Sequence, residues 1–207
     1  ITRKAIAIKS ADSSSLDYPN LVLSKKQQII YEKIYKSFNN NPQNFLPQVI
    51  HGVSGSGKTE LYIKLITKII SKGKTAIVLL PEILLTTHIA ERFKKYFNNR
   101  VATWHSKMTA SQKKLTLNGI INKNYDVVIG ARSAVFVPIN NLGLIIVDEE
   151  QESSYKQNET LPYYHARDVA LMRAKLSNAN IVLGSATPSL ETYYNSLKGK
   201  NEFHVLN

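Results

Sequence analysis

The stretch that decides the fold is Gly52-Val53-Ser54-Gly55-Ser56-Gly57-Lys58-Thr59. It matches the pattern G-x-x-x-x-G-K-[ST], with an apolar run before it and a helical pattern after it, so a chance glycine turn explains it poorly. The glycines let the backbone curl until successive N–H groups point at phosphates, and the helix N-terminus adds partial positive charge. Lys58 is expected to reach the β- and γ-phosphates, and the Thr59 hydroxyl to bind Mg²⁺. All eight residues are therefore predicted to bind ATP together with Mg²⁺.

An acidic pair follows a second apolar run, at residues 144–147. Ligands of α/β folds bind where the strands end, so Asp148 and Glu149 are expected near the phosphates. Asp148 is predicted to hold Mg²⁺, directly or through water. Glu149 is predicted to be the general base that activates the attacking water. The alternative is a turn that is merely rich in acids, and the phosphate-binding pattern upstream makes it a poor explanation.

Short Val/Ile/Leu runs alternate with helical patterns along most of the chain. This alternation predicts an α/β fold with a mostly parallel sheet that helices cover on both faces. The expected strands are 48–52, 75–80, 100–104, 126–130, 142–148 and 181–184. The expected helices are 24–38, 58–71, 84–97, 111–122, 163–176 and 189–197. Residues 1–20 are expected to form a strand-like stub at 5–8 and a polar linker.

The composition points to a polyanionic partner. The 207 residues include 27 Lys+Arg against 15 Asp+Glu, a formal charge of +12. Such a surplus favours nucleic acid, because phosphate contacts release counterions, although lysines that only solvate the surface are the alternative. The absence of cysteine excludes disulfides and a Cys-based zinc site within the chain, and it fits a reducing compartment. No apolar run approaches the roughly 20 residues of a membrane span, so no membrane partner is expected.

The acidic run extends to a fourth residue that distinguishes the chain from kinases and small GTPases. The fourth side chain, Gln151, is able to contact both the γ-phosphate and a neighbouring motif. Ser185 and Thr187 end a further predicted strand and offer hydroxyls for that contact. We predict that Gln151 has a catalytic role and that Ser185 and Thr187 relay the state of the nucleotide to motion.

The ordered motifs resemble superfamily 2 helicases and, more narrowly, the replication-restart helicases of bacteria. The matching stretches are 51–60, 79–83, 129–136, 141–151, 154–157, 164–170 and 183–190. The resemblance runs from about residue 23 to 193 and implies a RecA-like P-loop lobe. One residue departs from the family pattern: the acidic box usually ends in His, whereas here it ends in Gln151. An amide still donates and accepts at once, so the relay remains possible.

The resemblance also implies roles for residues outside the phosphate loop. Gln27 resembles the glutamine that recognises adenine, although an exposed helical glutamine is the alternative. Pro81, Glu82, Arg132 and Ser133 lie in motifs that resemble DNA-tracking segments, which grip phosphates and not bases.

The loop after the acidic box resembles an aromatic-rich segment of the family. Tyr155, Tyr163 and Tyr164 are expected to stack on bases, and Lys156 to meet a phosphate, with packing of one or two tyrosines as the alternative. Trp104 and His105 either line the path of the bound DNA strand or are simply packing residues, and the two alternatives remain equally open. His51, His165 and Arg167 are expected to be structural.

By the same resemblance, ATP lies between two lobes, and the second lobe supplies an arginine finger. The chain is therefore expected to be the first lobe (21–207) of a longer protein, preceded by a linker remnant (1–20), without the second lobe, zinc module or N-terminal DNA-binding domain. Alone it is expected to be nearly inactive.

The implied function is a bacterial cytoplasmic, nucleoid-associated 3′→5′ DNA helicase, ATP-dependent, that restarts stalled forks and initiates primosome assembly. The implied partners are single-stranded and forked DNA, primosome and replisome-loading proteins, and single-stranded-DNA-binding protein. Another superfamily 2 translocase, or a non-catalytic DNA-binding assembly module, is the alternative.

Overall fold

The computed structural model describes residues 21–40, 45–86 and 88–206, so the expected stub and linker at residues 1–20 lie outside the described residues. Its centre is a seven-stranded sheet with the order β3-β4-β2-β5-β8-β1-β9, in which every pairing is parallel. The strands are β1 (Gln48–His51), β2 (Thr75–Leu79), β3 (Val101–Trp104), β4 (Val127–Gly130), β5 (Leu142–Val147), β8 (Asn180–Ser185) and β9 (Glu202–Val205). The predicted α/β class and its parallel sheet are confirmed, and six of these strands match the expected ones closely.

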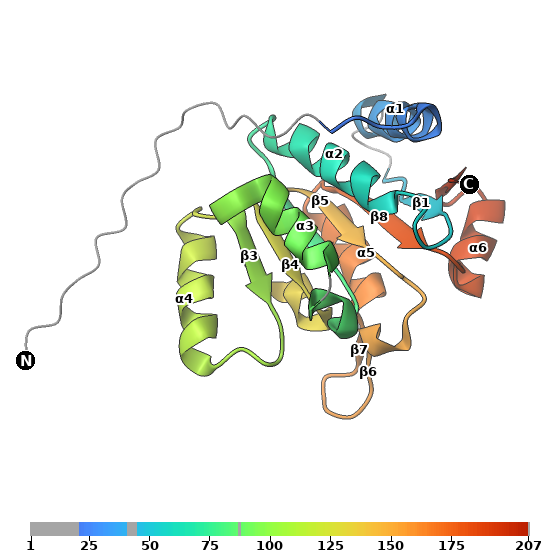
Figure 1. Cartoon of the computed structure of the whole chain (residues 1–207). Helices are drawn as coiled ribbons and strands as arrows, with labels where there is room; N and C mark the ends of the chain where they lie inside the picture. The colour runs from blue at the N-terminus through green and yellow to red at the C-terminus, as the bar shows by residue number, and fades with distance from the viewer. Residues whose placement is uncertain (1–20, 41–44, 87, 207) are drawn as a thin grey trace, which may run out of the picture.

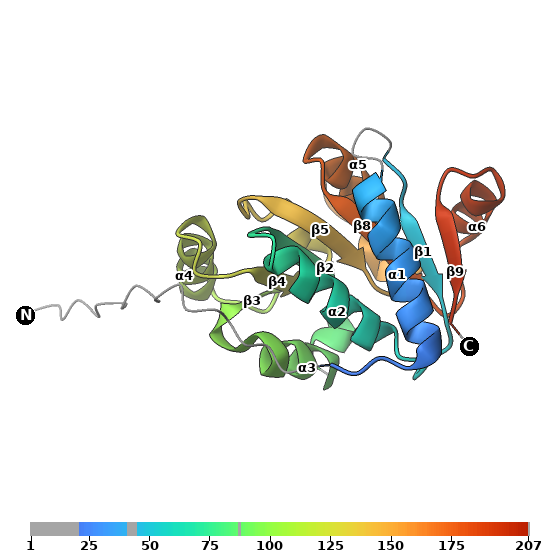
Figure 2. The ribbon, with the colours of Figure 1, turned by 90° about the horizontal axis from the view of Figure 1, so that it is seen from above.

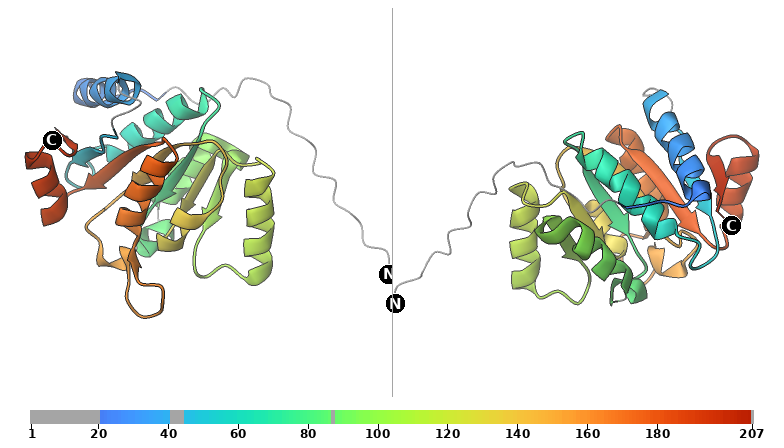
Figure 3. Two further views of the ribbon diagram at one scale, coloured as in Figure 1. Left: turned by 180° about the vertical axis from the view of Figure 1, so that it is seen from behind. Right: turned by 45° about the horizontal axis from the view of Figure 1, so that its top comes forward.

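Helices cover both faces of the sheet (Figure 1). One face carries α1 (Lys25–Asn40), α2 (Lys58–Ile70) and α3 (His88–Phe97), as the view from above shows (Figure 2). The other face carries α4 (Ala110–Ile121) and α5 (Ala166–Leu176), seen from behind in Figure 3. The last helix, α6 (Leu190–Leu197), lies beside the β9 edge. None of the described helices is long and apolar enough to cross a membrane.

Each central strand supplies side chains to two cores. Ile146 and Val182 pack toward α1–α3, whereas their neighbours Ile145 and Ile181 pack toward α4 and α5. This alternation follows from the two-residue period of a strand. Because both faces are covered, both sets are apolar, which is why the sequence shows continuous Val/Ile/Leu runs.

Two predicted helices begin later than expected. The segment predicted as one helix from residue 84 opens with a 3-10 turn, Glu82–Thr86, before α3 starts at His88. The helix predicted from residue 163 starts at Ala166, because Tyr164–His165 (β7) pairs antiparallel with Lys156–Gln157 (β6). His165 has extended backbone angles, and its Nδ1 accepts the Arg167 N–H at 3.3 Å, so this side chain caps α5.

The edge strand β9 was not predicted. It pairs with β1, and the Phe203 ring lies 5.7 Å from the ring of His51. With a glutamate and a histidine among its four residues and only partial burial, it lacks the continuous apolar run that identified the other strands.

Helix α2 approaches β8 very closely at Gly184. A Cβ atom there would lie 1.6 Å from the Tyr62 hydroxyl oxygen and 2.9 Å from Asp148 Oδ1. The Tyr62 hydroxyl donates to that Oδ1 at 2.8 Å, in a buried environment. Glycine at this position therefore allows a buried tyrosine and a buried aspartate to meet.

We expect Gly184→Ala to lower the free energy of unfolding by about 1–3 kcal/mol, the usual cost of overpacking. The double variant Gly184→Ala/Tyr62→Phe removes the hydroxyl that the new methyl group meets, so part of this loss should return relative to Tyr62→Phe alone. Urea unfolding of the four proteins measures the coupling. Additive losses would contradict the proposed contact.

Candidate functional site

The glycine-rich loop joins the carboxyl end of β1 to the amino end of α2. Gly55 and Gly57 adopt the left-handed conformation, with φ of 81° and 92°, which is available to glycine without strain. Val53, Ser54 and Gly55 are exposed, so the loop backbone is open to solvent. The loop therefore presents its amides at the start of a helix, the arrangement that binds phosphate.

Lys58 lies at the base of this loop and is 7% exposed. Its Nζ donates to the Gly52 carbonyl oxygen at 2.6 Å and lies 3.7 Å from Glu149 Oε1. The nearby Ser56 Oγ is buried and has no hydrogen-bond partner among the described residues. A buried cation and an unsatisfied hydroxyl in one loop suit a polyanionic group such as a triphosphate.

Asp148 directly follows β5, beside the loop, and is 4% exposed. Burial raises the pKa of its carboxyl from 3.8 to about 6; the hydrogen bond from Tyr62 opposes the rise, and the charge of Glu149 adds to it. An ionised carboxylate in a buried place has lost its hydration, and a divalent cation replaces the lost interactions, so Asp148 is suited to bind one. Thr59, half-buried in the first turn of α2, is the second predicted Mg²⁺ ligand. The residues present thus fit Mg²⁺ bound together with phosphate oxygens.

Glu149 begins a chain of hydrogen bonds across the ends of β5 and β8. Its Oε2 accepts from Gln151 Nε2 at 2.9 Å, and Gln151 Oε1 accepts from the Ser185 hydroxyl at 2.6 Å. The Ser185 Oγ in turn accepts the Thr187 backbone N–H at 2.8 Å. The structure therefore brings the predicted relay residues together, with Thr187 joined through its backbone and not its hydroxyl. Gln151 uses both ends of its amide, Nε2 as a donor and Oε1 as an acceptor.

Gln27 is buried against the phosphate loop and is not exposed on its helix. Its Oε1 accepts the Ser24 N–H at 2.7 Å, and its Nε2 donates to the Gly57 carbonyl at 3.2 Å. These bonds fix α1 to the loop and still leave one N–H and one lone pair on the amide. Recognition of adenine by Gln27 stays a prediction.

The predicted DNA-binding residues lie at the same edge of the sheet, after β2 and β4. Pro81 is buried, whereas Glu82 is exposed and accepts a hydrogen bond from Ser106. Arg132 and Ser133 begin the 3-10 turn Arg132–Phe136, and Ser133 is exposed.

Arg132 is bound to the loop after the acidic box. Its Nη1 donates to the Lys156 carbonyl at 2.8 Å, and its guanidinium lies 5.9 Å from the Tyr164 ring centre. Tyr164 also meets Phe136 edge-on at 5.1 Å, while Tyr163 and Lys156 are exposed. Trp104 and His105 are half-buried, so contact with DNA and simple packing both stay predictions for these two residues.

Tyr155 requires a correction. It was predicted to stack on a DNA base, but its side chain is 1% exposed. Its hydroxyl donates to the Asp148 carbonyl oxygen at 2.7 Å. A ring enclosed in the core cannot meet a base, so Tyr155 braces the acidic box.

Sequence reasoning missed Glu150, which is 0% exposed. Its carboxylate accepts from Arg167 Nη1 at 3.0 Å, from the Ser189 N–H at 2.8 Å and from the Thr192 hydroxyl at 3.0 Å. Arg167, which was expected to be structural, forms an ion pair with this buried carboxylate. The available signal was a third consecutive acid after a buried strand, because such a charge needs a partner.

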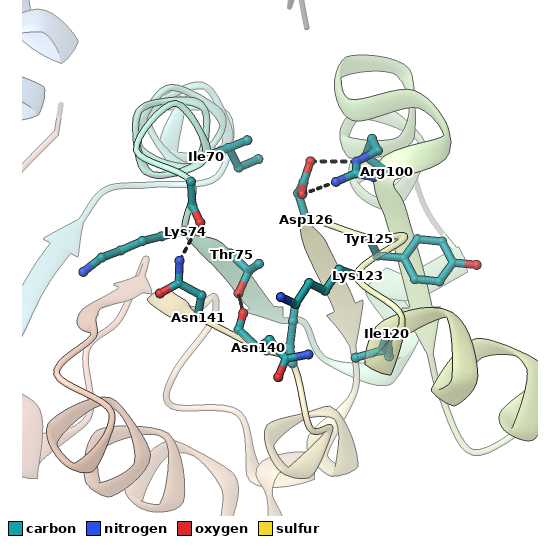
Figure 4. A pocket seen from close by; sticks show the side chains of 12 residues that line it. Ile70, Lys74, Thr75, Arg100, Ile120, Lys123, Tyr125, Asp126, Asn140 and Asn141 are labelled. Carbon is teal, nitrogen blue, oxygen red and sulfur yellow. Dashed lines mark hydrogen bonds and ion pairs between the residues drawn. The ribbon is translucent and has the colours of Figure 1, made fainter. Parts of the chain in front are cut away.

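A pocket of about 310 Å³ opens at the opposite edge of the sheet (Figure 4). It lies at the amino ends of β2, β4 and β5, where Arg100 binds Asp126 through two hydrogen bonds of 2.9 and 2.6 Å. None of the predicted site residues lines this pocket. The ion pair instead ties the segments that lead into β3 and β4.

Curated relatives named Replication restart protein PriA are similar to this chain over most of its length. The protein of Bacillus subtilis (strain 168) is 46% identical over 182 residues, which is 88% of this chain and 22% of that protein. The protein of Rickettsia felis is 42% identical over 207 residues, which is 100% of this chain and 30% of that protein. The chain therefore spans less than a third of the length of these relatives.

Solved structures share the fold. The structure of RecG bound to a three-way DNA junction has a TM-score of 0.64 at 24% identity, covering 90% of this chain and 24% of that one. The yeast DEAD-box splicing factor Prp28 has a TM-score of 0.60 at 13% identity, covering 78% of this chain and 42% of that one. Residues 24–196, which include the phosphate loop, the acidic box and the relay, match the family described as DEAD/DEAH box helicase. The chain belongs to the DEAD/DEAH box helicase family.

Proposed function

We propose that the chain is the first, nucleotide-binding lobe of an ATP-dependent 3′→5′ DNA helicase that restarts stalled replication forks and initiates primosome assembly. The carrying observation is the continuous set of contacts from Lys58 through Glu149 and Gln151 to Ser185. Membership in the helicase family implies use of a nucleotide, and the names of the curated relatives support the replication-restart role. A second lobe, outside this chain, completes the site.

In this proposal the phosphate loop and Lys58 bind the triphosphate. Lys58 leaves the Gly52 carbonyl and reaches the β- and γ-phosphates, while the loop amides hold the same oxygens. Mg²⁺, when bound, neutralises charge on these oxygens, and Thr59 and Asp148 are the residues that hold it. The deprotonated carboxylate of Asp148 is the form that would hold Mg²⁺, and burial raises its pKa to about 6 in the Mg²⁺-free chain.

Glu149 acts on the attacking water. The water oxygen bonds to the γ-phosphorus, the bond to the ADP oxygen breaks, and the water proton passes to the Glu149 carboxylate. Gln151 donates a hydrogen bond to this carboxylate and accepts one from Ser185, so a movement of the carboxylate also moves the Ser185 side chain. Loss of the γ-phosphate thereby changes the hydrogen bonds at the end of β8, which leads to α6.

The DNA partner is proposed to lie along the same edge. Contacts with the phosphate backbone of DNA, independent of base sequence, are supported by three features. These are the positive charge of the chain, the exposed Ser133 and Lys156, and the Arg132 side chain. We propose single-stranded and forked DNA as the substrate. Primosome and replisome-loading proteins and single-stranded-DNA-binding protein are the proposed protein partners, in the bacterial cytoplasm at the nucleoid.

Lys58→Ala in the full-length protein should lower kcat for ATP hydrolysis by about 10²–10³-fold, since one preorganised charge on the transferring group is lost. Unwinding should stop, while the Kd for forked DNA changes less than about twofold because Lys58 contacts no DNA. ATPase, unwinding and fluorescence anisotropy assays measure these quantities. Lys64→Ala, six residues further along the same helix, is the matched control and should leave all three near wild type. Equal loss of fork binding in Lys58→Ala would show that Lys58 is structural.

Asp148→Asn should stabilise the Mg²⁺-free chain at pH 7.5. The folded-state pKa is raised from 3.8 to about 6, so stability is lost as pH rises through this range, by up to ~3 kcal/mol at ~1.4 kcal/mol per unit. The amide removes that loss, and its advantage should shrink toward pH 4. Urea unfolding at pH 7.5 and 4.5 tests this. Glu159→Gln, on the exposed loop between β6 and β7, is the control, and its effect should stay below about 0.5 kcal/mol. An Asp148→Asn gain that is independent of pH would contradict the raised pKa.

The 207-residue chain by itself should hydrolyse ATP at least about 10³-fold more slowly than the full-length protein, because an arginine finger from a second lobe contributes that much in other triphosphatases. DNA-stimulated turnover measured side by side decides the point. Comparable rates would show that one lobe suffices.

A further inference from the structure

Glu149 has an unusual backbone for its residue type. Its φ is 48°, in the left-handed region that side chains with a Cβ rarely adopt. Of the other four described non-glycine residues with positive φ, one is Lys123 and three are asparagines, which tolerate this region well. A glutamate has no such local compensation, so the surrounding structure must impose the conformation.

The residue before Glu149 is held on both sides of its backbone. The Asp148 N–H donates to the Leu79 carbonyl at 3.0 Å, which continues the ladder between β5 and β2. The Asp148 carbonyl accepts the Tyr155 hydroxyl at 2.7 Å. This carbonyl belongs to the peptide group that joins Asp148 to Glu149, so Tyr155 fixes the plane on which the Glu149 φ angle is defined.

The residue after Glu149 is held more firmly still. The Glu150 N–H donates to the Gly184 carbonyl at 3.0 Å, which fixes the peptide plane on the other side of Glu149. The Glu150 carboxylate is enclosed by Arg167, Ser189 and Thr192, at distances of 2.8 to 3.1 Å. A buried carboxylate with this many charge-assisted bonds resists displacement.

With both neighbours fixed, Glu149 has one direction left for its side chain. Its carboxylate lies between Lys58 Nζ at 3.7 Å and Gln151 Nε2 at 2.9 Å, on the side of the phosphate loop. In an extended or helical conformation the side chain would leave Cα in a different direction. The conformation therefore determines whether the carboxylate faces the place where the attacking water must be.

We propose that Tyr155, Glu150 and Arg167 are positioning residues for ATP hydrolysis, which hold Glu149 in its left-handed conformation and so aim the general base. This inference rests on the proposed ATPase function. Tyr155 and Arg167 belong to the two ends of the segment that carries β6 and β7, and they bind the two neighbours of Glu149 separately. Two independent anchors, one on a carbonyl and one on a carboxylate, define the backbone of a single residue between them.

The test uses the full-length protein with Tyr155→Phe and Arg167→Lys. Tyr155→Phe removes one hydroxyl and keeps the buried ring, while Arg167→Lys keeps the charge and removes the forked geometry. Each should lower kcat by about tenfold or more, because displacing a reacting group by about 1 Å costs on the order of 10²-fold. KM for ATP and Kd for DNA should change less than about twofold, since the phosphate loop and the DNA-facing side chains are untouched. Glu150→Gln, which keeps shape and loses charge, should behave like Arg167→Lys.

Arg173→Lys is the matched control. Arg173 lies on the same helix as Arg167 and is also half-buried, but it donates to the carbonyls of Val135 and Val137, away from the acidic box. It should keep kcat near wild type. Thermal unfolding and nucleotide binding confirm that each variant is folded before its rate is compared.

A double-variant cycle with Glu149→Gln separates positioning from general damage. If Tyr155 acts only through Glu149, adding Tyr155→Phe to Glu149→Gln should lower the residual rate less than about twofold, because their effects are not additive. Unchanged kcat in folded Tyr155→Phe and Arg167→Lys would overturn the inference, as would a full further loss in the double variant. A wild-type protein without ATPase activity would overturn the proposed function, and this inference with it.

Discussion

The structure depends on how three consecutive carboxylates are accommodated at the end of one buried strand. Asp148, Glu149 and Glu150 follow β5 directly, and like charges this close destabilise one another unless each has its own partner. Asp148 receives the Tyr62 hydroxyl, Glu149 faces Lys58 and Gln151, and Glu150 is enclosed with Arg167. Glu150 also binds Gly184 of β8 and Thr192 of α6, so the acidic run ties α2, β8, α5 and α6 to the same strand end.

The features that the sequence predicted correctly are those with a local cause. Apolar runs of strand length identified six of the seven main strands, because a parallel sheet covered on both faces makes its strands uniformly apolar. The phosphate loop was predictable since left-handed glycines, a lysine and a helix start lie in eight consecutive residues. The start of α5 was missed because a two-residue strand pairing across a loop delays the helix, and pairing partners are not local.

The candidate site also contains features with a local cause in the sequence and features that depend on residues distant in the sequence. A relay function for Gln151 and Ser185 stays a prediction, but the contact between these two side chains was predictable from the order of the motifs. Burial was not: Tyr155 and Tyr163 are both tyrosines of one loop, yet the first is 1% and the second 64% exposed. Only the path of the chain around the acidic box decides which ring turns inward. Glu150 shows the converse, since its role depends on Arg167 and Thr192, which are remote in sequence and adjacent in space.

The acidic box ends in Gln151, where the resemblance to the helicase family implies a His, and this changes which group is expected to respond to pH. The relay from Glu149 to Thr187 passes through an amide, a hydroxyl and a backbone N–H, none of which titrates near neutral pH. An imidazole in the same place would add a titration near its usual pKa of about 6.5. At this site the titration in that range belongs to Asp148 instead, whose pKa burial raises to about 6. The group whose pKa lies nearest neutral pH is therefore the proposed Mg²⁺ ligand Asp148 and not the proposed relay residue Gln151.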